Sequence, residues 1–157
     1  MGIEPVITFV VPVRHPANST NWTGLCARLT QTVRSIAAQT HPSWRGVVVA
    51  NHEADIPALP DGFSLVRVDF PPNRMHDFSS GTREAVLDAF RWDKGRRVLA
   101  GMLGSIPSKY FMIVDDDDFV SRDLTGYVAD RSEENGWIVK RGLIWPENSR
   151  FLYLHRD

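Results

Sequence analysis

The sequence predicts an α/β fold: a mainly parallel, twisted sheet with helices on both faces, followed by a short C-terminal hairpin. Two observations support this prediction. Strand-like and helix-like segments alternate along roughly the first 130 residues, and the strand-like segments are apolar almost without interruption. Such strands are typical of parallel sheets, because helices cover both of their faces. The length of 157 residues fits a single domain.

The first half of the chain supplies three strands and one helix. Residues 7–11 are mostly apolar and β-branched, and they predict the first strand. A helix is expected over residues 25–37, where apolar side chains recur at intervals of three and four. Residues 47–50 and 64–68 predict the next two strands. Residues 71–80 are polar and rich in turn residues, so we expect an irregular surface segment there.

The second half begins with a long helical pattern and ends in strands. Apolar residues predict a helix from Thr82 to about Ile106, although Gly95 and Gly101 leave open one helix or two shorter ones. A buried strand follows at residues 110–114, and a short helix is expected at residues 123–129. Strand-like segments close the chain at residues 136–139, 143–145 and 151–154, the last two as a hairpin.

Composition and charge exclude several classes of protein. The formal net charge is −1, so no global positive field attracts nucleic acid. Cys26 is the single cysteine, which excludes an internal disulfide. The first residues lack the pattern of a signal peptide, and the longest apolar runs have the length of strands, so no transmembrane segment is expected. These features predict a soluble, cytoplasmic protein.

Four aspartates in succession, Asp115 to Asp118, follow the apolar strand at residues 110–114. Two carboxylates about 5 Å apart repel each other by roughly 3 kcal/mol at an effective dielectric constant near 20. A divalent cation relieves this repulsion, and ligands that are all oxygen suit Mg²⁺ or Mn²⁺. In an extended chain Asp115 and Asp117 would share one side. The alternative is a solvated acidic turn that caps the helix starting near Asp123.

A basic segment upstream could hold the phosphates that complete such a metal site, because Mg²⁺ usually keeps only one or two carboxylate ligands. Lys94 offers a point charge, and Arg96 or Arg97 could clamp a diphosphate with two parallel hydrogen bonds. The alternative is an exposed basic helix face that pairs with Glu84 or Asp88.

Polar residues stand at the ends of three predicted strands. They are the segments 12–15, 51–53 and the aspartate run. In open parallel sheets, ligands bind beyond the carboxyl ends of the strands. We therefore expect these three segments to lie near one another and to form a binding site.

These segments, in this order, resemble the GT-A glycosyltransferases, in particular the family 2 type, whose sheet is Rossmann-like. Asp115 to Asp118 have the Asp-x-Asp-Asp form of that family's DXD motif, directly after a strand. The resemblance covers most of residues 6–130. The matching segments are residues 7–14, 25–39, 44–51, 94–101 and 111–118.

The resemblance implies a set of nucleoside contacts at the ends of the first two strands. Pro12, Val13 and Arg14 would lie against the nucleoside. Asn51 or Glu53 would meet the base, where family members often carry an acidic residue. The donor expected from the resemblance is a nucleotide sugar, with a UDP-sugar favoured.

The resemblance also implies how the diphosphate and the metal would be held. Arg96 or Arg97 would approach the diphosphate. Asp115 or Asp116 would contact the ribose or a water bound to the metal, and Asp117 would ligate Mn²⁺ or Mg²⁺ directly. Asp115 is the second candidate metal ligand.

The activity implied is the metal-dependent transfer of a hexose from the nucleotide sugar to a saccharide or another hydroxyl acceptor. Family members usually continue into an acceptor-binding half that carries the general base. We therefore expect the chain to be a donor-binding half, a truncated form or a divergent short relative. The later carboxylates stand in no recognisable base motif, so the catalytic residue is unassigned; they are Glu133, Glu134, Glu147 and Asp157. A module that binds nucleotide sugar without turnover and a metal-dependent nucleotidyltransferase are the alternatives.

Overall fold

The structure, a computed structural model, describes residues 4–75, 81–146 and 149–156. Its body is a four-stranded sheet with the order β3-β2-β1-β4, and all three strand pairings are parallel. This arrangement confirms the predicted α/β fold. The strands are β1 (Ile7–Pro12), β2 (Trp44–Asn51), β3 (Phe63–Val68) and β4 (Tyr110–Ile113).

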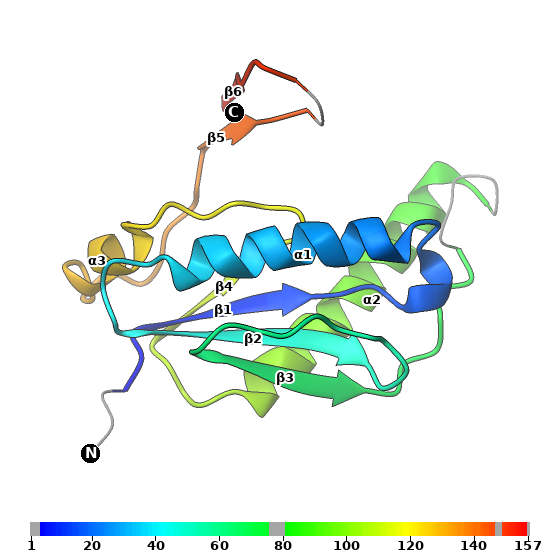
Figure 1. Cartoon of the computed structure of the whole chain (residues 1–157), viewed down its shortest axis with the longest axis horizontal. Helices are drawn as coiled ribbons and strands as arrows, with labels where there is room; N and C mark the ends of the chain where they lie inside the picture. Colours follow the sequence, from blue (N-terminus) through cyan, green and yellow to red (C-terminus); the bar gives the residue numbers. More distant parts are fainter. Residues whose placement is uncertain (1–3, 76–80, 147–148, 157) are drawn as a thin grey trace.

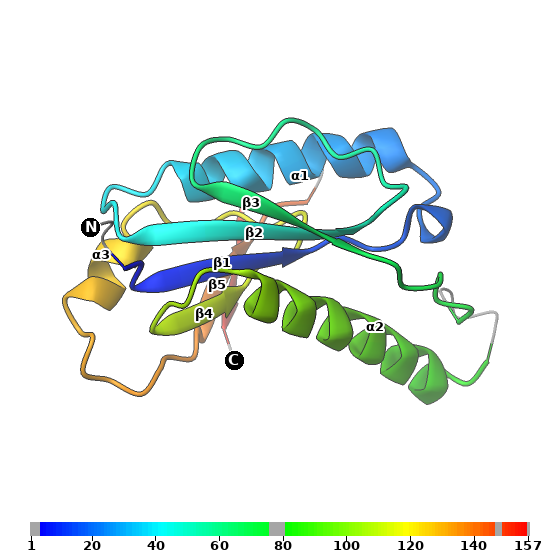
Figure 2. The same ribbon diagram turned by 90° about the horizontal axis from the view of Figure 1, so that it is seen from below.

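The two long helices cover opposite faces of the sheet, α1 (Trp22–Ala37) on one and α2 (Arg83–Gly104) on the other (Figures 1 and 2). Alternate residues of β1 therefore enter two separate cores. Phe9 and Val11 belong to the apolar cluster on the α1 side, whereas Val10 belongs to the cluster that includes Ala100 of α2. Both faces of the central strands are buried, which explains why their sequences are apolar without alternation.

Helix α2 is one continuous helix, so the alternative of two shorter helices is wrong. Gly101 has a packing role inside it. A β-carbon at this position would lie 2.7 Å from Cγ2 of Val49 and 2.8 Å from Cγ1 of Val10. The absent side chain lets the helix approach the sheet closely, and this contact compensates for the low helix propensity of glycine.

The C-terminal part contains the short helix α3 (Leu124–Ala129) and an antiparallel hairpin of β5 (Arg141–Ile144) and β6 (Tyr153–Arg156). The hairpin was predicted, and it projects away from the sheet (Figure 1). The strand predicted at residues 136–139 is absent. Trp137 is instead held by side-chain packing, with its ring centroid 4.9 Å from that of Tyr110 and 6.1 Å from that of Tyr127.

Residues 71–75 contain no helix or strand, as predicted for the irregular segment that begins at residue 71. The remainder of that prediction, residues 76–80, lies outside the described part of the chain. A short 3₁₀ helix, η1 (Pro16–Asn18), follows β1. None of the helices that the structure describes is long and apolar enough to cross a membrane.

Candidate functional site

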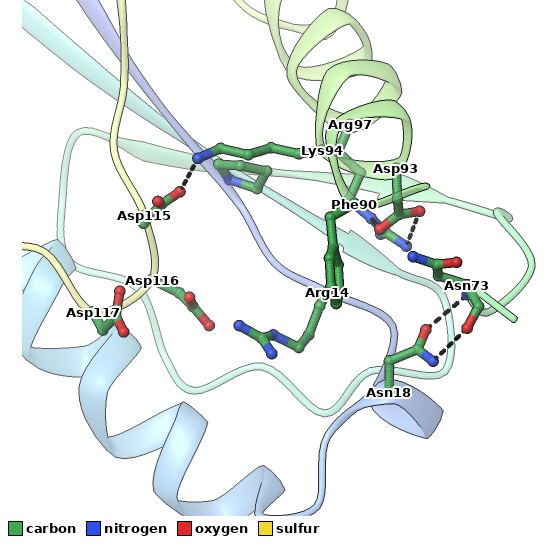
Figure 3. Close-up of a pocket in the computed structure, with 11 residues that line it drawn as sticks. Arg14, Asn18, Asn73, Phe90, Asp93, Lys94, Arg97, Asp115, Asp116 and Asp117 are labelled. Carbon is green, nitrogen blue, oxygen red and sulfur yellow. Dashed lines mark hydrogen bonds and ion pairs between the residues drawn. The ribbon is translucent and has the colours of Figure 1, made fainter. Parts of the chain in front are cut away.

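A cavity of about 320 Å³ lies beyond the carboxyl ends of β1 and β4. This is the edge of a parallel sheet at which ligands bind. In Figure 3 Asp115, Asp116 and Asp117 lie on the left of the cavity, Asn18 and Asn73 lie on the right, and Arg14 lies between them. The residues that line it are Pro12, Arg14, Asn18, Asn73, Phe90, Asp93, Lys94, Arg97, Asp115, Asp116 and Asp117.

The aspartate run turns immediately after β4, and this turn decides which carboxylates reach the cavity. The backbone N–H of Asp118 donates a hydrogen bond to the carbonyl oxygen of Asp115, with N and O 3.2 Å apart. Alternation along an extended chain was therefore the wrong expectation. Asp115, Asp116 and Asp117 all line the cavity, whereas Asp118 is not among the lining residues.

Negative charge in this turn is only partly compensated by protein cations. Asp116 is 8% exposed, and burial raises the pKa of its carboxyl. The positive charge of Arg14 lowers this pKa, whereas the negative charge of Asp117 raises it further. Burial also raises the pKa of Asp118. Nζ of Lys94 lies 2.5 Å from Oδ1 of Asp115, and both side chains are about half exposed. A further cation in the cavity would therefore favour the ionised carboxylates.

The basic segment on α2 forms a compact ion-paired cluster around Asp93. Arg97 is 1% exposed, and its Nε donates to Oδ2 of Asp93 over 2.9 Å. Nε of Arg96 donates to the other carboxylate oxygen, Oδ1, also over 2.9 Å. Burial on its own would raise the pKa of Asp93, but the hydrogen bonds from Arg97 and Arg96 outweigh it and lower that pKa.

This cluster overturns the alternative in which the basic segment pairs with Glu84 or Asp88. The exposed Asp88 pairs with Arg91 instead, with Nη1 and Oδ1 2.9 Å apart. Arg97 lines the cavity even though its guanidinium is held by Asp93. Arg96 lies outside that lining and borders a separate depression with Pro71, Pro72, Trp92 and others.

Besides Arg96, three residues predicted to contact the nucleotide lie outside the lining of the cavity. Val13 is fully buried in the core on the α1 side. Asn51 is also buried, and both ends of its side-chain amide are already engaged. Its Oδ1 accepts a hydrogen bond from Nη1 of Arg97 over 2.8 Å, and its Nδ2 donates one to the carbonyl of Phe70 over 2.7 Å. Oε1 of Glu53 lies 2.6 Å from Nε2 of His15. Nucleotide contact by these residues stays a prediction.

The site also contains residues that the sequence did not reveal. Asn18 and Phe90 line the cavity from η1 and α2, and Asn73 lines it from the segment after β3. Residues 71–80 show no periodicity, so no sequence signal pointed to Asn73. Asp93 could have been found, because it precedes Arg96 by three residues and Arg97 by four on a helix, the spacing of side-chain ion pairs.

The donor set fits a hard divalent cation that keeps water or phosphate among its ligands. Asp115, Asp116 and Asp117 face one cavity, and their oxygen atoms are the ligands that Mg²⁺ and Mn²⁺ prefer. Within the described residues, no group of three or more His, Cys, Asp or Glu side chains is arranged to hold a metal by itself. A cation at this site would need ligands beyond the protein.

Comparison with known proteins includes a weak structural likeness. No protein-family model matches the chain, and no curated protein matches it. Among solved structures, TarS of S. aureus is similar, with 13% sequence identity and a TM-score of 0.42 over 92% of this chain. The match covers 22% of TarS, so the chain spans about a fifth of that protein's length. A likeness of this strength carries no argument about activity, which rests on the site itself.

Proposed function

We propose that the cavity binds a nucleotide sugar, with UDP-sugars as the expected donors, together with Mn²⁺ or Mg²⁺. The chain would supply the donor-binding part of a glycosyltransferase that moves a hexose to a hydroxyl of a saccharide or other acceptor. One observation carries this proposal: three consecutive aspartates, Asp115 to Asp117, share a single cavity with Lys94 and Arg14 beyond the ends of two parallel strands. The likeness of these segments to GT-A glycosyltransferases of family 2 supports it.

The charges in the cavity explain why the ligand would be a diphosphate with a metal. Asp117 is the proposed metal ligand, and Asp115 is the second candidate. The bound cation would supply positive charge that stabilises the departing nucleoside diphosphate. Lys94 pairs with Asp115 in the free protein, so a lysine released from that pair would find phosphate oxygens in the same cavity.

The nucleoside would lie towards the other lining residues. Pro12 is the last residue of β1 and offers an apolar surface. Arg14 supplies a second cation beside Asp116. Asp116 is the proposed partner of a ribose hydroxyl, because a buried carboxyl exchanges hydrogen bonds with hydroxyl groups in either protonation state. Arg97 has little freedom to clamp a phosphate, since Asp93 and Asn51 already hold its guanidinium.

Binding without turnover is the second candidate function, and one observation favours it. Four carboxylates line the cavity. Asp93 is held by two arginines, and the other three belong to the proposed metal and ribose contacts. Within the described lining, no carboxylate is left to deprotonate an acceptor hydroxyl. Free UDP released from a UDP-sugar by the purified protein would exclude this candidate. Release of pyrophosphate from UTP in the presence of a sugar 1-phosphate would indicate nucleotidyl transfer instead.

Thermal denaturation with Mn²⁺ and UDP tests the proposed binding. A ligand at about 100 times its Kd stabilises the folded protein by roughly 2.7 kcal/mol, so the melting temperature should rise. Asp117→Asn should abolish this rise while leaving the melting temperature of the free protein nearly unchanged. Asp118→Asn is the matched control, because Asp118 belongs to the same run but does not line the cavity. A rise in Asp117→Asn equal to that of the wild type would refute the metal assignment.

A further inference from the structure

The segment after β3 is fixed as one wall of the cavity by hydrogen bonds to three other elements. The carbonyl of Phe70 accepts from Nδ2 of Asn51, and the carbonyl of Pro71 accepts from Nη2 of Arg96 over 3.0 Å. Asn18 and Asn73 are joined twice: Nδ2 of Asn18 donates to the Asn73 carbonyl over 2.9 Å, and the Asn73 N–H donates to Oδ1 of Asn18 over 2.8 Å. This wall is therefore held in place before any ligand arrives.

The side-chain amide of Asn73 has one orientation. Its Oδ1 accepts from the backbone N–H of Met75 over 2.9 Å. A flipped amide would put two donors against each other, so Nδ2 must occupy the other position. Figure 3 shows this nitrogen on the side of the amide that faces the cavity.

That nitrogen is a buried hydrogen-bond donor with no partner among the described residues, and less than 1 Å² of it is open to water. A buried donor left unpaired destabilises the folded protein, because it loses its hydrogen bonds to water without replacing them. Such groups are rare in native proteins and call for a specific explanation. Because Asn73 lines the same cavity as the aspartate run, a ligand atom in that cavity is a suitable partner.

Phe90 lines the same cavity and offers an aromatic surface to such a ligand. Its ring lines the cavity and is 37% exposed. A ligand would reach the buried nitrogen after a neighbouring side chain shifts. The flat face of the Phe90 ring would be available for stacking on a planar base, as aromatic side chains stack on bases in nucleic-acid complexes.

We propose that Asn73 reads the nucleobase of the donor, with Nδ2 donating to a ring carbonyl oxygen while the base stacks on Phe90. Only the donor half of the amide is free, so the site selects an acceptor atom such as the carbonyl of uracil. Asn51 and Glu53, the residues expected to meet the base, are already engaged by Arg97 and His15. The inference rests on the proposed function, because it assumes that a nucleoside diphosphate occupies the cavity.

Calorimetric titration of the whole chain with UDP and with inorganic pyrophosphate, both in the presence of Mn²⁺, separates this contact from the rest of the site. Asn73→Asp keeps the acceptor for Met75 but replaces the donor with an acceptor. Asn73→Ala removes the donor without adding charge. Asn135→Asp is the matched control, since Asn135 is an exposed asparagine outside this cavity.

We expect the Kd for UDP to rise at least tenfold in both Asn73 variants, with the Kd for pyrophosphate changed less than twofold in Asn73→Ala. Asn135→Asp should bind both ligands as the wild type does. Wild-type affinity for UDP in Asn73→Ala, or an equal loss of UDP and pyrophosphate affinity in that variant, would overturn the role of Asn73 while leaving the proposed function standing. Absence of UDP binding by the wild-type protein would instead refute the proposed function, and this inference with it.

Discussion

Two charged clusters border the same cavity, and they differ in how their charge is compensated. Asp93 receives hydrogen bonds from Arg96 and Arg97, and its pKa is lowered despite burial. In the aspartate run only Asp115 has a close ion pair within the described structure, with Lys94, and the pKa values of Asp116 and Asp118 are raised. The first cluster is complete without a ligand and fixes the fold. The second is only partly compensated by Lys94 and Arg14, as expected of a site that binds a cation.

The largest effect on stability should come from breaking the complete cluster. In Asp93→Asn, Arg97 keeps a buried charge without a counter-charge, and the free energy of unfolding should fall by about 3 kcal/mol. Denaturation by urea measures this change. Asp88→Asn, which breaks the exposed pair with Arg91 on the same helix, should cost less than about 1 kcal/mol. Equal effects of the two substitutions would contradict a structural role for the buried cluster.

The same cluster should make the protein sensitive to acid. The pKa of Asp93 is lower in the folded protein than its ordinary value of 3.8, so the unfolded chain binds the proton at a higher pH. The stabilisation from Asp93 is therefore present above pH 3.8 and is lost as the pH falls through the folded-state pKa. The melting temperature of the wild type should fall more steeply in this range than that of Asp93→Asn. Parallel curves for the two proteins would show that Asp93 does not contribute.

The smallest effect on stability should come from the incomplete cluster. Lys94 and Asp115 form a half-exposed pair, so Lys94→Ala should change the free energy of unfolding by less than about 1 kcal/mol. Its effect should appear on binding instead, because Lys94 would meet the diphosphate. A calorimetric titration should show weaker binding of UDP with Mn²⁺. A large loss of stability with unchanged binding would reverse the roles assigned to the two clusters.

The sheet could be predicted from the sequence because its signals are local. Runs that are mostly apolar and β-branched, such as residues 7–11, identify strands that are buried on both faces, and helical periodicity identifies α1 and α2. Residues 136–139 carry a similar apolar signal, but Trp137 packs against Tyr110 and Tyr127 without pairing its backbone into a strand. Tertiary packing decided that segment, and the local pattern could not show it.

The site was only partly predictable for the same reason. The aspartate run and Lys94 were found because charge next to a buried strand or at a helix is visible in the sequence. Arg97 is buried and bonded to Asn51, a residue 46 positions away in the sequence. Local reasoning could anticipate neither the burial nor the bond. Asn73 is paired with Asn18 across 55 positions, within a segment that has no pattern of its own.

Electron paramagnetic resonance of Mn²⁺ tests most directly whether the aspartate run is an incomplete metal site that a diphosphate completes. Free Mn²⁺ gives a six-line signal that broadens when the ion is bound to protein. With UDP present, the wild type and Asp118→Asn should remove this signal far more than UDP alone, whereas Asp117→Asn should not. Equal loss of the signal in Asp117→Asn and the wild type would contradict the account.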